Sequence, residues 1–250
     1  MQAYSADRSF KGKLRRQVSK LAVRRPVRMT LDRPMITFGF DDAPVTATTA
    51  GAEALEARGV RGVYYFSAGL VGRTGPMGVY AEREDAVRLA ANGHEVACHT
   101  FSHLDCGQAD GPAIVAEVDR NAADLDAWGL PARESFAYPY GDVSIPAKRA
   151  LGGRFRTLRT VTAGLVENGS DANQLPAVGI EGADGEAKAM RWLDRAAERK
   201  AWLMLFTHDV EQNPSAWGCT PEALGHLIDA AIARGFDIVT AAEGARRLGL

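Results

Sequence analysis

The chain has 250 residues, of which 46% are hydrophobic and 24% charged, with 30 Lys and Arg against 31 Asp and Glu. These values are ordinary for a globular protein and exclude long disorder, a collagen helix or a coiled coil as the main state. Its three cysteines, which show no Cys-x-x-Cys spacing, exclude a disulfide scaffold or a four-cysteine zinc module, and no run of 18 apolar residues predicts a transmembrane span.

The charge is unevenly distributed along the chain. Residues 1–33, here called the basic extension, carry ten basic and two acidic side chains, a net +8 that leaves −9 for the remainder. We expect no nucleic-acid partner, because the whole chain has a net charge of −1. The extension also lacks the apolar run of a secretory signal, which together with the unpaired cysteines favours the cytoplasm.

Within the basic extension, Phe10, Leu14, Val18 and Leu21 recur at helical spacing among Lys and Arg residues. One interpretation is a helix that lies on an anionic membrane surface, which would place the protein peripherally at the inner membrane. The other is a helix that packs on the rest of the chain, or on a second subunit of a homodimer, with a solvated basic face. The sequence leaves both open.

From residue 35 onward, short apolar runs alternate with Ala- and Leu-rich helical stretches. The runs predict strands at 35–40, 62–68, 94–100, 135–140, 156–161, 175–180, 202–209 and 236–241. Helices are predicted at 46–58, 82–92, 112–128, 186–199 and 221–234, and Gly59, Gly93, Gly129 and Gly235 follow four of them. This alternation predicts a parallel sheet covered by helices, as a closed β/α barrel or an open doubly wound sheet.

Polar residues gather where the predicted strands end, which in a β/α barrel is the catalytic rim. The segments are Asp41-Asp42, His99 with His103, Tyr138-Pro139-Tyr140-Gly141, and His208-Asp209. The i,i+4 spacing of His99 and His103 would face both imidazoles the same way on one helical turn. With Asp42 they form a three-ligand set that leaves room for water and substrate, although Asp42 as a helix cap is the simpler alternative.

These segments follow one another in the order of a known family. Phe40-Asp41-Asp42-Ala43-Pro44, His99-x-x-Ser102-His103, Tyr138-Pro139-Tyr140-Gly141 and Phe206-Thr207-His208-Asp209 resemble the motifs of the polysaccharide deacetylases (NodB-homology, carbohydrate esterase family four) over about residues 35–245. The resemblance implies a distorted (β/α)7 barrel, here one domain over 34–250. It also implies metal-dependent removal of acetyl groups from N-acetylated sugars.

The resemblance also implies a role for each matching residue. Asp42, His99 and His103 would bind a divalent metal, usually zinc, which polarises the acetyl carbonyl and activates water. Asp41 would be the general base and His208 the general acid. Tyr140, next to Pro139, would offer its backbone N–H to the oxyanion. Trp217 and Asp142 are candidates for lining the sugar cleft, although core packing explains Trp217 equally well.

The match departs from the family at three points. Ala43 stands where the family usually has Gly, a mild change if the local φ is negative. Ala137 stands where many members have the arginine that orients the base. Arg159, near the end of the next predicted strand, is a hypothetical substitute, with a rim ion pair as the alternative. The family's Asp-x-x-Asp-Trp motif is not visible.

The sequence therefore favours an N-deacetylase that acts on N-acetylglucosamine-type units of a bacterial exopolysaccharide or its lipid-linked precursor, similar to holdfast-type deacetylases. Two alternatives remain. An O-acetyl esterase would use the same metal and base, and a catalytically weak glycan-binding protein would explain the missing arginine.

Overall fold

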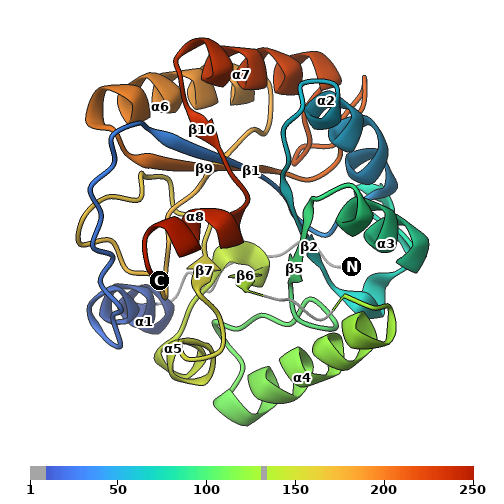
Figure 1. Ribbon diagram of the computed structural model, residues 1–250. Coiled ribbons are helices and arrows are strands. Elements are labelled where there is room, and N and C mark those ends of the chain that lie inside the picture. The colour runs from blue at the N-terminus through green and yellow to red at the C-terminus, as the bar shows by residue number, and fades with distance from the viewer. Residues whose placement is uncertain (1–9, 131–133) are drawn as a thin grey trace.

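The computed structural model describes residues 10–130 and 134–250, and a curved parallel sheet lies at its centre (Figure 1). The sheet order is β7-β6-β5-β2-β1-β9-β8, and β10 also pairs with β1. Its strands are β1 (Met35–Phe40), β2 (Val63–Phe66), β5 (Glu95–Cys98), β6 (Ser135–Ala137), β7 (Thr157–Arg159), β8 (Val178–Gly179), β9 (Trp202–Thr207) and β10 (Asp237–Ile238). Because every ladder in this sheet is parallel, the carboxyl ends of the strands share one edge.

The two edge strands of this sheet approach each other and nearly close the barrel. Arg159 of β7 forms a parallel bridge with Leu175, which precedes β8, and Leu175 N–H donates to Leu158 O at 2.8 Å. Along β1 the partner strand changes: β10 pairs with Met35 and Ile36, whereas β2 pairs only with Gly39 and Phe40. The start of β1 therefore pairs with β10 and its end with β2, so the barrel is irregular at this position. The distorted β/α barrel predicted from the sequence is confirmed.

Helices surround the sheet on its outer side (Figure 1). They are α2 (Ala52–Glu56), α3 (Arg83–Ala91), α4 (Gly111–Ala127), α5 (Ile145–Leu151), α6 (Gly185–Arg199) and α7 (Pro221–Ala233). The last helix, α8 (Ala241–Arg247), lies within this ring in Figure 1, and its Ala241 is buried in one cluster with Met35 and Trp202. Asp110, Ser144, Thr220 and Thr240 cap four of these helices by accepting a hydrogen bond from the third helical N–H. The glycines expected to end helices, Gly59, Gly93, Gly129 and Gly235, all have positive φ.

Some elements differ from the sequence expectation. The predicted helix at 46–58 begins with a π-helical turn, Ala47–Gly51, before α2. Short 3-10 turns occur at Ala68–Leu70 and Pro139–Gly141, and a small hairpin pairs β3 (Thr74–Gly75) with β4 (Gly78–Val79). The hairpin, α5 and α8 were not predicted, because segments of two to seven residues are too short to show a period.

The strands alternate between two apolar clusters. Met35 of β1 packs inside the barrel with residues such as Trp202 and Phe206, whereas Ile36, Phe38 and Phe40 pack outward under the helices. Since side chains alternate along a strand, the residue after Phe40 points back into the barrel. This register places Asp41 inside.

The basic extension is docked through polar contacts. Its helix α1 (Phe10–Leu21) lies beside α5 (Figure 1), where the buried Lys148 Nζ donates to Ser19 O at 2.5 Å and Ala22 O at 3.0 Å. Two residues of the predicted apolar stripe face solvent, since Val18 is 42% exposed and Leu21 is 80% exposed. The side chains of Phe10 and Leu14 lie outside the described part of the chain. None of the described helices has the length and apolar character to span a bilayer.

Candidate active site

The two aspartates after β1 point in different directions. Asp41 continues the strand, its N–H donating to Thr207 O of β9 at 2.9 Å, and its side chain enters the barrel interior. Asp42 and Ala43 then turn sharply, with φ of 59° and 46°. Ala43 was expected to be a mild change if its φ were negative, and its φ is positive. An alanine in the left-handed region costs roughly 1–2 kcal/mol, and the usual Gly would avoid that cost.

His99 and His103 are brought together by a loop and not by the helical turn that their spacing predicted. His99 directly follows β5, and both Thr100 and His103 have positive φ, at 63° and 61°. Glu117 of α4 holds the loop by accepting hydrogen bonds from the N–H groups of Phe101 at 3.1 Å and Ser102 at 2.7 Å. The i,i+4 spacing correctly predicted that His99 and His103 lie together, but the helical turn on which that prediction was based is wrong.

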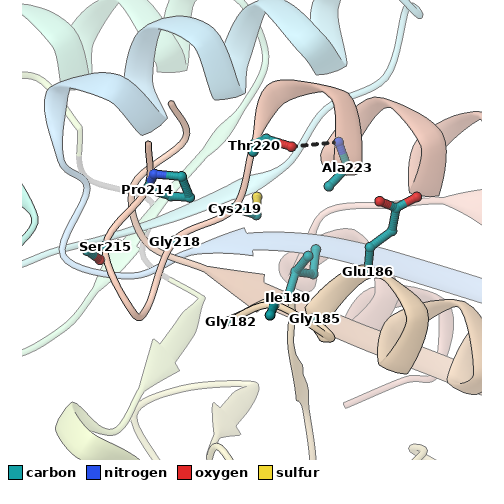
Figure 2. A pocket seen from close by; sticks show the side chains of 11 residues that line it. Ile180, Gly182, Gly185, Glu186, Pro214, Ser215, Gly218, Cys219, Thr220 and Ala223 are labelled. Carbon is teal, nitrogen blue, oxygen red and sulfur yellow. Dashed lines mark hydrogen bonds between the residues drawn. The ribbon is translucent and has the colours of Figure 1, made fainter. Parts of the chain in front are cut away.

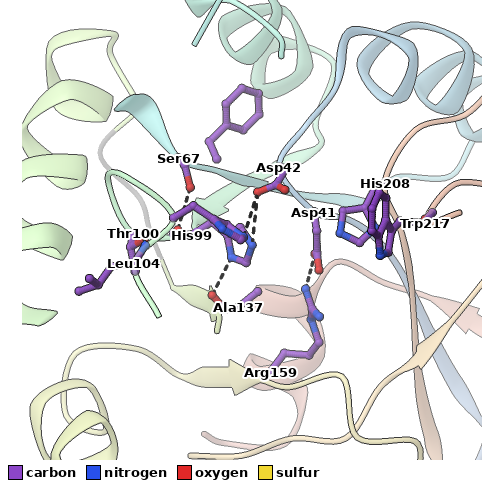
Figure 3. A network of polar contacts seen from close by, with 12 residues as sticks. Asp41, Asp42, Ser67, His99, Thr100, Leu104, Ala137, Arg159, His208 and Trp217 are labelled. Atoms are coloured by element: carbon purple, nitrogen blue, oxygen red, sulfur yellow. Dashed lines mark hydrogen bonds and ion pairs between the residues drawn. The ribbon is translucent and has the colours of Figure 1, made fainter. Parts of the chain in front are cut away.

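Asp42, His99 and His103 form a buried cluster whose ligand atoms all lie within 4.8 Å of one another (Figure 3). Asp42 Oδ1 lies 3.6 Å from His99 Nε2 and 3.4 Å from His103 Nε2, and it accepts no hydrogen bond from any of the described residues. His99 Nδ1 lies 2.8 Å from Ala137 O, which fixes the tautomer whose Nε2 has a free electron pair.

Burial also sets the protonation of this cluster. Burial lowers the pKa of His99 to about 4, with a contribution from the nearby His103, and burial likewise lowers the pKa of His103 to about 4. Both imidazoles are therefore neutral near pH 7, the form that binds metal. One carboxylate oxygen and two imidazole nitrogens, with a buried oxygen left unpaired, fit a divalent cation.

Arg159 forms a buried ion pair with Asp41 beside this cluster (Figure 3). The guanidinium also lies 4.9 Å from the ring centroids of both Tyr65 and Phe206. Burial alone would raise the pKa of Asp41, but the charges of Arg159, His99 and His208 outweigh that effect. The pKa of Asp41 is therefore lowered, and its carboxylate stays ionised. Arg159 pairs in register with Ala137, so the positive charge lies one strand away from the position expected in the family.

His208 follows β9 and lies next to Asp41 (Figure 3). Its Nδ1 lies 3.1 Å from Trp217 O and 3.7 Å from Glu181 Oε1. The loop that carries Trp217 is held by the fully buried Asp209, which accepts hydrogen bonds from Ser215 N and Oγ, both at 2.6 Å. Glu181 was missed by sequence reasoning, although a carboxylate just after the weak strand at 175–180 was a usable signal.

Pro139, Tyr140 and Gly141 form a tight turn after β6. Tyr140 has a φ of 60°, and its ring meets the ring of His103 edge-on, with centroids 4.3 Å apart. Pro139 is buried, and Gly141 N–H donates to Tyr138 O at 2.8 Å. Asp142, a candidate for lining the sugar cleft, is buried, and its side chain accepts a hydrogen bond from Arg15.

A cavity of about 330 Å³ lies beside the loop that carries Trp217 (Figure 2). It is lined by residues that include Ile180, Gly182, Ser215, Gly218, Cys219 and Thr220. None of Asp41, Asp42, His99, His103 or His208 lines it. The chemistry described above is therefore located outside this cavity.

Comparison with known sequences identifies the family. The sequence pattern described as polysaccharide deacetylase matches residues 28–152, which is 125 of the 250 residues. The chain therefore belongs to the polysaccharide deacetylase family. A search of curated proteins found no significant match.

Several solved structures share the fold. A chitin deacetylase from the fungus Colletotrichum lindemuthianum is 16% identical, with a TM-score of 0.63 over 88% of this chain and 92% of its own. A family 4 acetyl xylan esterase from Clostridium thermocellum, solved with a cobalt ion, is 20% identical, with a TM-score of 0.61 over 86% and 92%. A family 4 pseudoenzyme from Bacillus anthracis is 14% identical, with a TM-score of 0.59 over 88% and 68%.

We predict that removing any ligand of the Asp42, His99 and His103 cluster abolishes stoichiometric metal binding. Alanine at His99 or His103 takes away one of three donors, so Zn²⁺ or Co²⁺ affinity should fall by at least 100-fold, measured by equilibrium dialysis. His226→Ala is the control, because His226 is exposed and pairs only with Glu186 among the described contacts. Equal metal binding by His99→Ala and His226→Ala would contradict the prediction.

We predict that Arg159→Met lowers deacetylase turnover by roughly 10- to 100-fold while metal binding is retained, because the base loses its charged partner. Arg159→Ala combined with Ala137→Arg should recover part of that loss, since residues 137 and 159 are neighbours in register. Arg58→Met, which breaks an exposed ion pair with Asp229, is the matched control. Turnover of Arg159→Met equal to that of the control would remove Arg159 from the site.

Proposed function

We propose that this member of the polysaccharide deacetylase family is a metal-dependent N-deacetylase for N-acetylglucosamine-type units of a glycan. Family membership makes the chain a carbohydrate deacetylase and hence a hydrolase. The observation that carries the finer proposal is that an ionised carboxylate, Asp41, and an imidazole, His208, lie together beside the Asp42, His99 and His103 cluster (Figure 3).

In this proposal Asp42, His99 and His103 hold the cation, for which zinc suits the mixed nitrogen and oxygen donor set. When bound, the cation would supply Lewis acidity toward the acetyl carbonyl and the attacking water. Asp41 accepts the proton that this water loses, and Arg159 keeps the Asp41 carboxylate ionised and oriented.

The remaining residues act on the substrate after attack. The backbone N–H of Tyr140, next to the buried Pro139, donates to the oxygen that becomes negative in the tetrahedral intermediate. His208 then gives a proton to the amine as the C–N bond breaks, which leaves acetate and a free amino sugar. Glu181 Oε1 lies 3.7 Å from His208 Nδ1 and places a carboxylate beside this imidazole.

An exposed tryptophan on the loop that contacts His208 supports a sugar substrate. Trp217 is 42% exposed, and its backbone oxygen lies 3.1 Å from His208 Nδ1, so the loop that carries this exposed indole contacts the acid. Indole rings provide a flat apolar surface with a polar edge, which suits the face of a pyranose ring. We propose an exopolysaccharide or its lipid-linked precursor as the source of that sugar.

The proposed activity predicts acetate release and an equal amount of free amine from N-acetylated chitooligosaccharide, both lost on dialysis against a chelator and restored by Zn²⁺ or Co²⁺. An O-acetylated xylooligosaccharide serves as the ester substrate. Acetate from the ester alone would identify an O-acetyl esterase instead. Glycan binding with metal bound but no acetate from either substrate would identify a binding protein.

We propose cytoplasmic, peripheral contact with an anionic membrane through α1. Val18 and Leu21 are exposed, and so are the basic residues Lys20, Arg24 and Arg28 of the same extension. The three cysteines are buried and form no disulfide with one another, which supports a reducing compartment.

Membrane contact predicts that the protein cosediments with vesicles containing phosphatidylglycerol but not with pure phosphatidylcholine. Val18→Ser with Leu21→Ser should weaken this binding roughly tenfold or more, since each buried CH₂ contributes about 0.8 kcal/mol. Ile232→Ser, at an exposed apolar residue of α7, is the control. Unchanged cosedimentation of the double variant, or a homodimer that the same variant dissociates, would overturn membrane contact through this face.

A further inference from the structure

The turn that carries Tyr140 is held in a conformation that its own residues do not favour. Tyr140 and Gly141 are both left-handed, with φ of 60° and 67°. For Tyr140 this conformation costs roughly 1–2 kcal/mol, so surrounding contacts must maintain it. The position of the Tyr140 N–H, and with it the proposed oxyanion contact, depends on those contacts.

One contact comes from the residue directly after the turn. Asp142 is 5% exposed, and its Oδ1 accepts a hydrogen bond from Val143 N–H at 3.0 Å. A Cβ added at Gly107 would lie 2.4 Å from the Asp142 carboxyl carbon, so the carboxylate packs directly against the segment that follows His103. Asp142 therefore lies between the turn of Tyr140 and the loop of His103.

The positive charge that faces Asp142 comes from the other end of the sequence. Arg15 Nη2 of α1 donates to Asp142 Oδ2 at 2.9 Å. Arg15 lies outside residues 28–152, the part of the chain that matches the family. Its helix is fixed by Lys148, which also forms an ion pair with Asp171 at 2.6 Å.

We propose that Arg15 is a positioning residue for the deacetylation reaction: through Asp142 it holds the Tyr140 turn against the His103 loop. This inference rests on the proposed function. A charge-assisted hydrogen bond to a buried carboxylate is among the stronger side-chain contacts, so its loss lets the left-handed turn relax. The basic extension is then part of the active-site support and not an appendage.

The test is a set of full-length variants assayed for acetate release, metal binding and thermal unfolding. Arg15→Met and Asp142→Asn should each lower kcat about tenfold or more with little change in KM, because the turn acts after the sugar is bound. The double variant should lose no more than either single variant, since both break one contact. Arg15→Lys should recover part of kcat, and all variants should keep one metal per chain.

Arg25→Gln is the matched control. Arg25 also anchors the basic extension, donating to Gly152 O and Phe155 O at 2.9 Å each, but it contacts neither Asp142 nor the Tyr140 turn in the described contacts. Its substitution should lower the melting temperature without changing kcat. Wild-type kcat in Arg15→Met, or an equal loss of kcat in Arg25→Gln, would overturn the inference. Absence of acetate release by the wild-type protein would instead reject the proposed function.

Discussion

The buried ion pair between Arg159 and Asp41 connects the shape of the barrel to its chemistry. Arg159 comes from the edge strand β7, yet it meets Asp41 after β1 and contacts the rings of Tyr65 on β2 and Phe206 on β9. These contacts require a sheet curved enough to bring its edge over its centre. A buried charge without its partner costs about 3–5 kcal/mol, so the pair constrains the closure of the barrel as well as the orientation of the base.

Backbone strain in the described residues is concentrated at the same rim. Seven non-glycine residues have positive φ, and five of them lie in the loops of the site: Asp42, Ala43, Thr100, His103 and Tyr140. Each such residue costs on the order of 1–2 kcal/mol, which the hydrogen bonds of Glu117 and the packing of Asp142 offset. Left-handed residues turn the chain sharply. These turns let the side chains of Asp41 and Asp42 point apart and bring those of His99 and His103 together.

Sequence reasoning placed the long elements and the chemistry-bearing residues because both leave signals in order along the chain. The helices at 83–91, 111–127 and 185–199 lie within one residue of their predicted bounds, and Arg159 lies beside Asp41. What it could not supply were conformations fixed by tertiary contacts. The convergence of His99 and His103 through a loop, the positive φ of Ala43 and the approach of Glu181 to His208 all depend on residues far away in the sequence.

The basic extension shows how one helix can serve two surfaces. Most amphipathic helices dock by burying their apolar side, but α1 presents Val18 and Leu21 to solvent and is held by the polar contacts of Arg15, Lys148 and the backbone. Polar docking leaves Val18 and Leu21 exposed to a lipid surface. Arg15 contacts Asp142 through the same helix on which Val18, three residues later, is exposed. Binding a lipid-linked glycan and supporting the oxyanion turn would then depend on the same element.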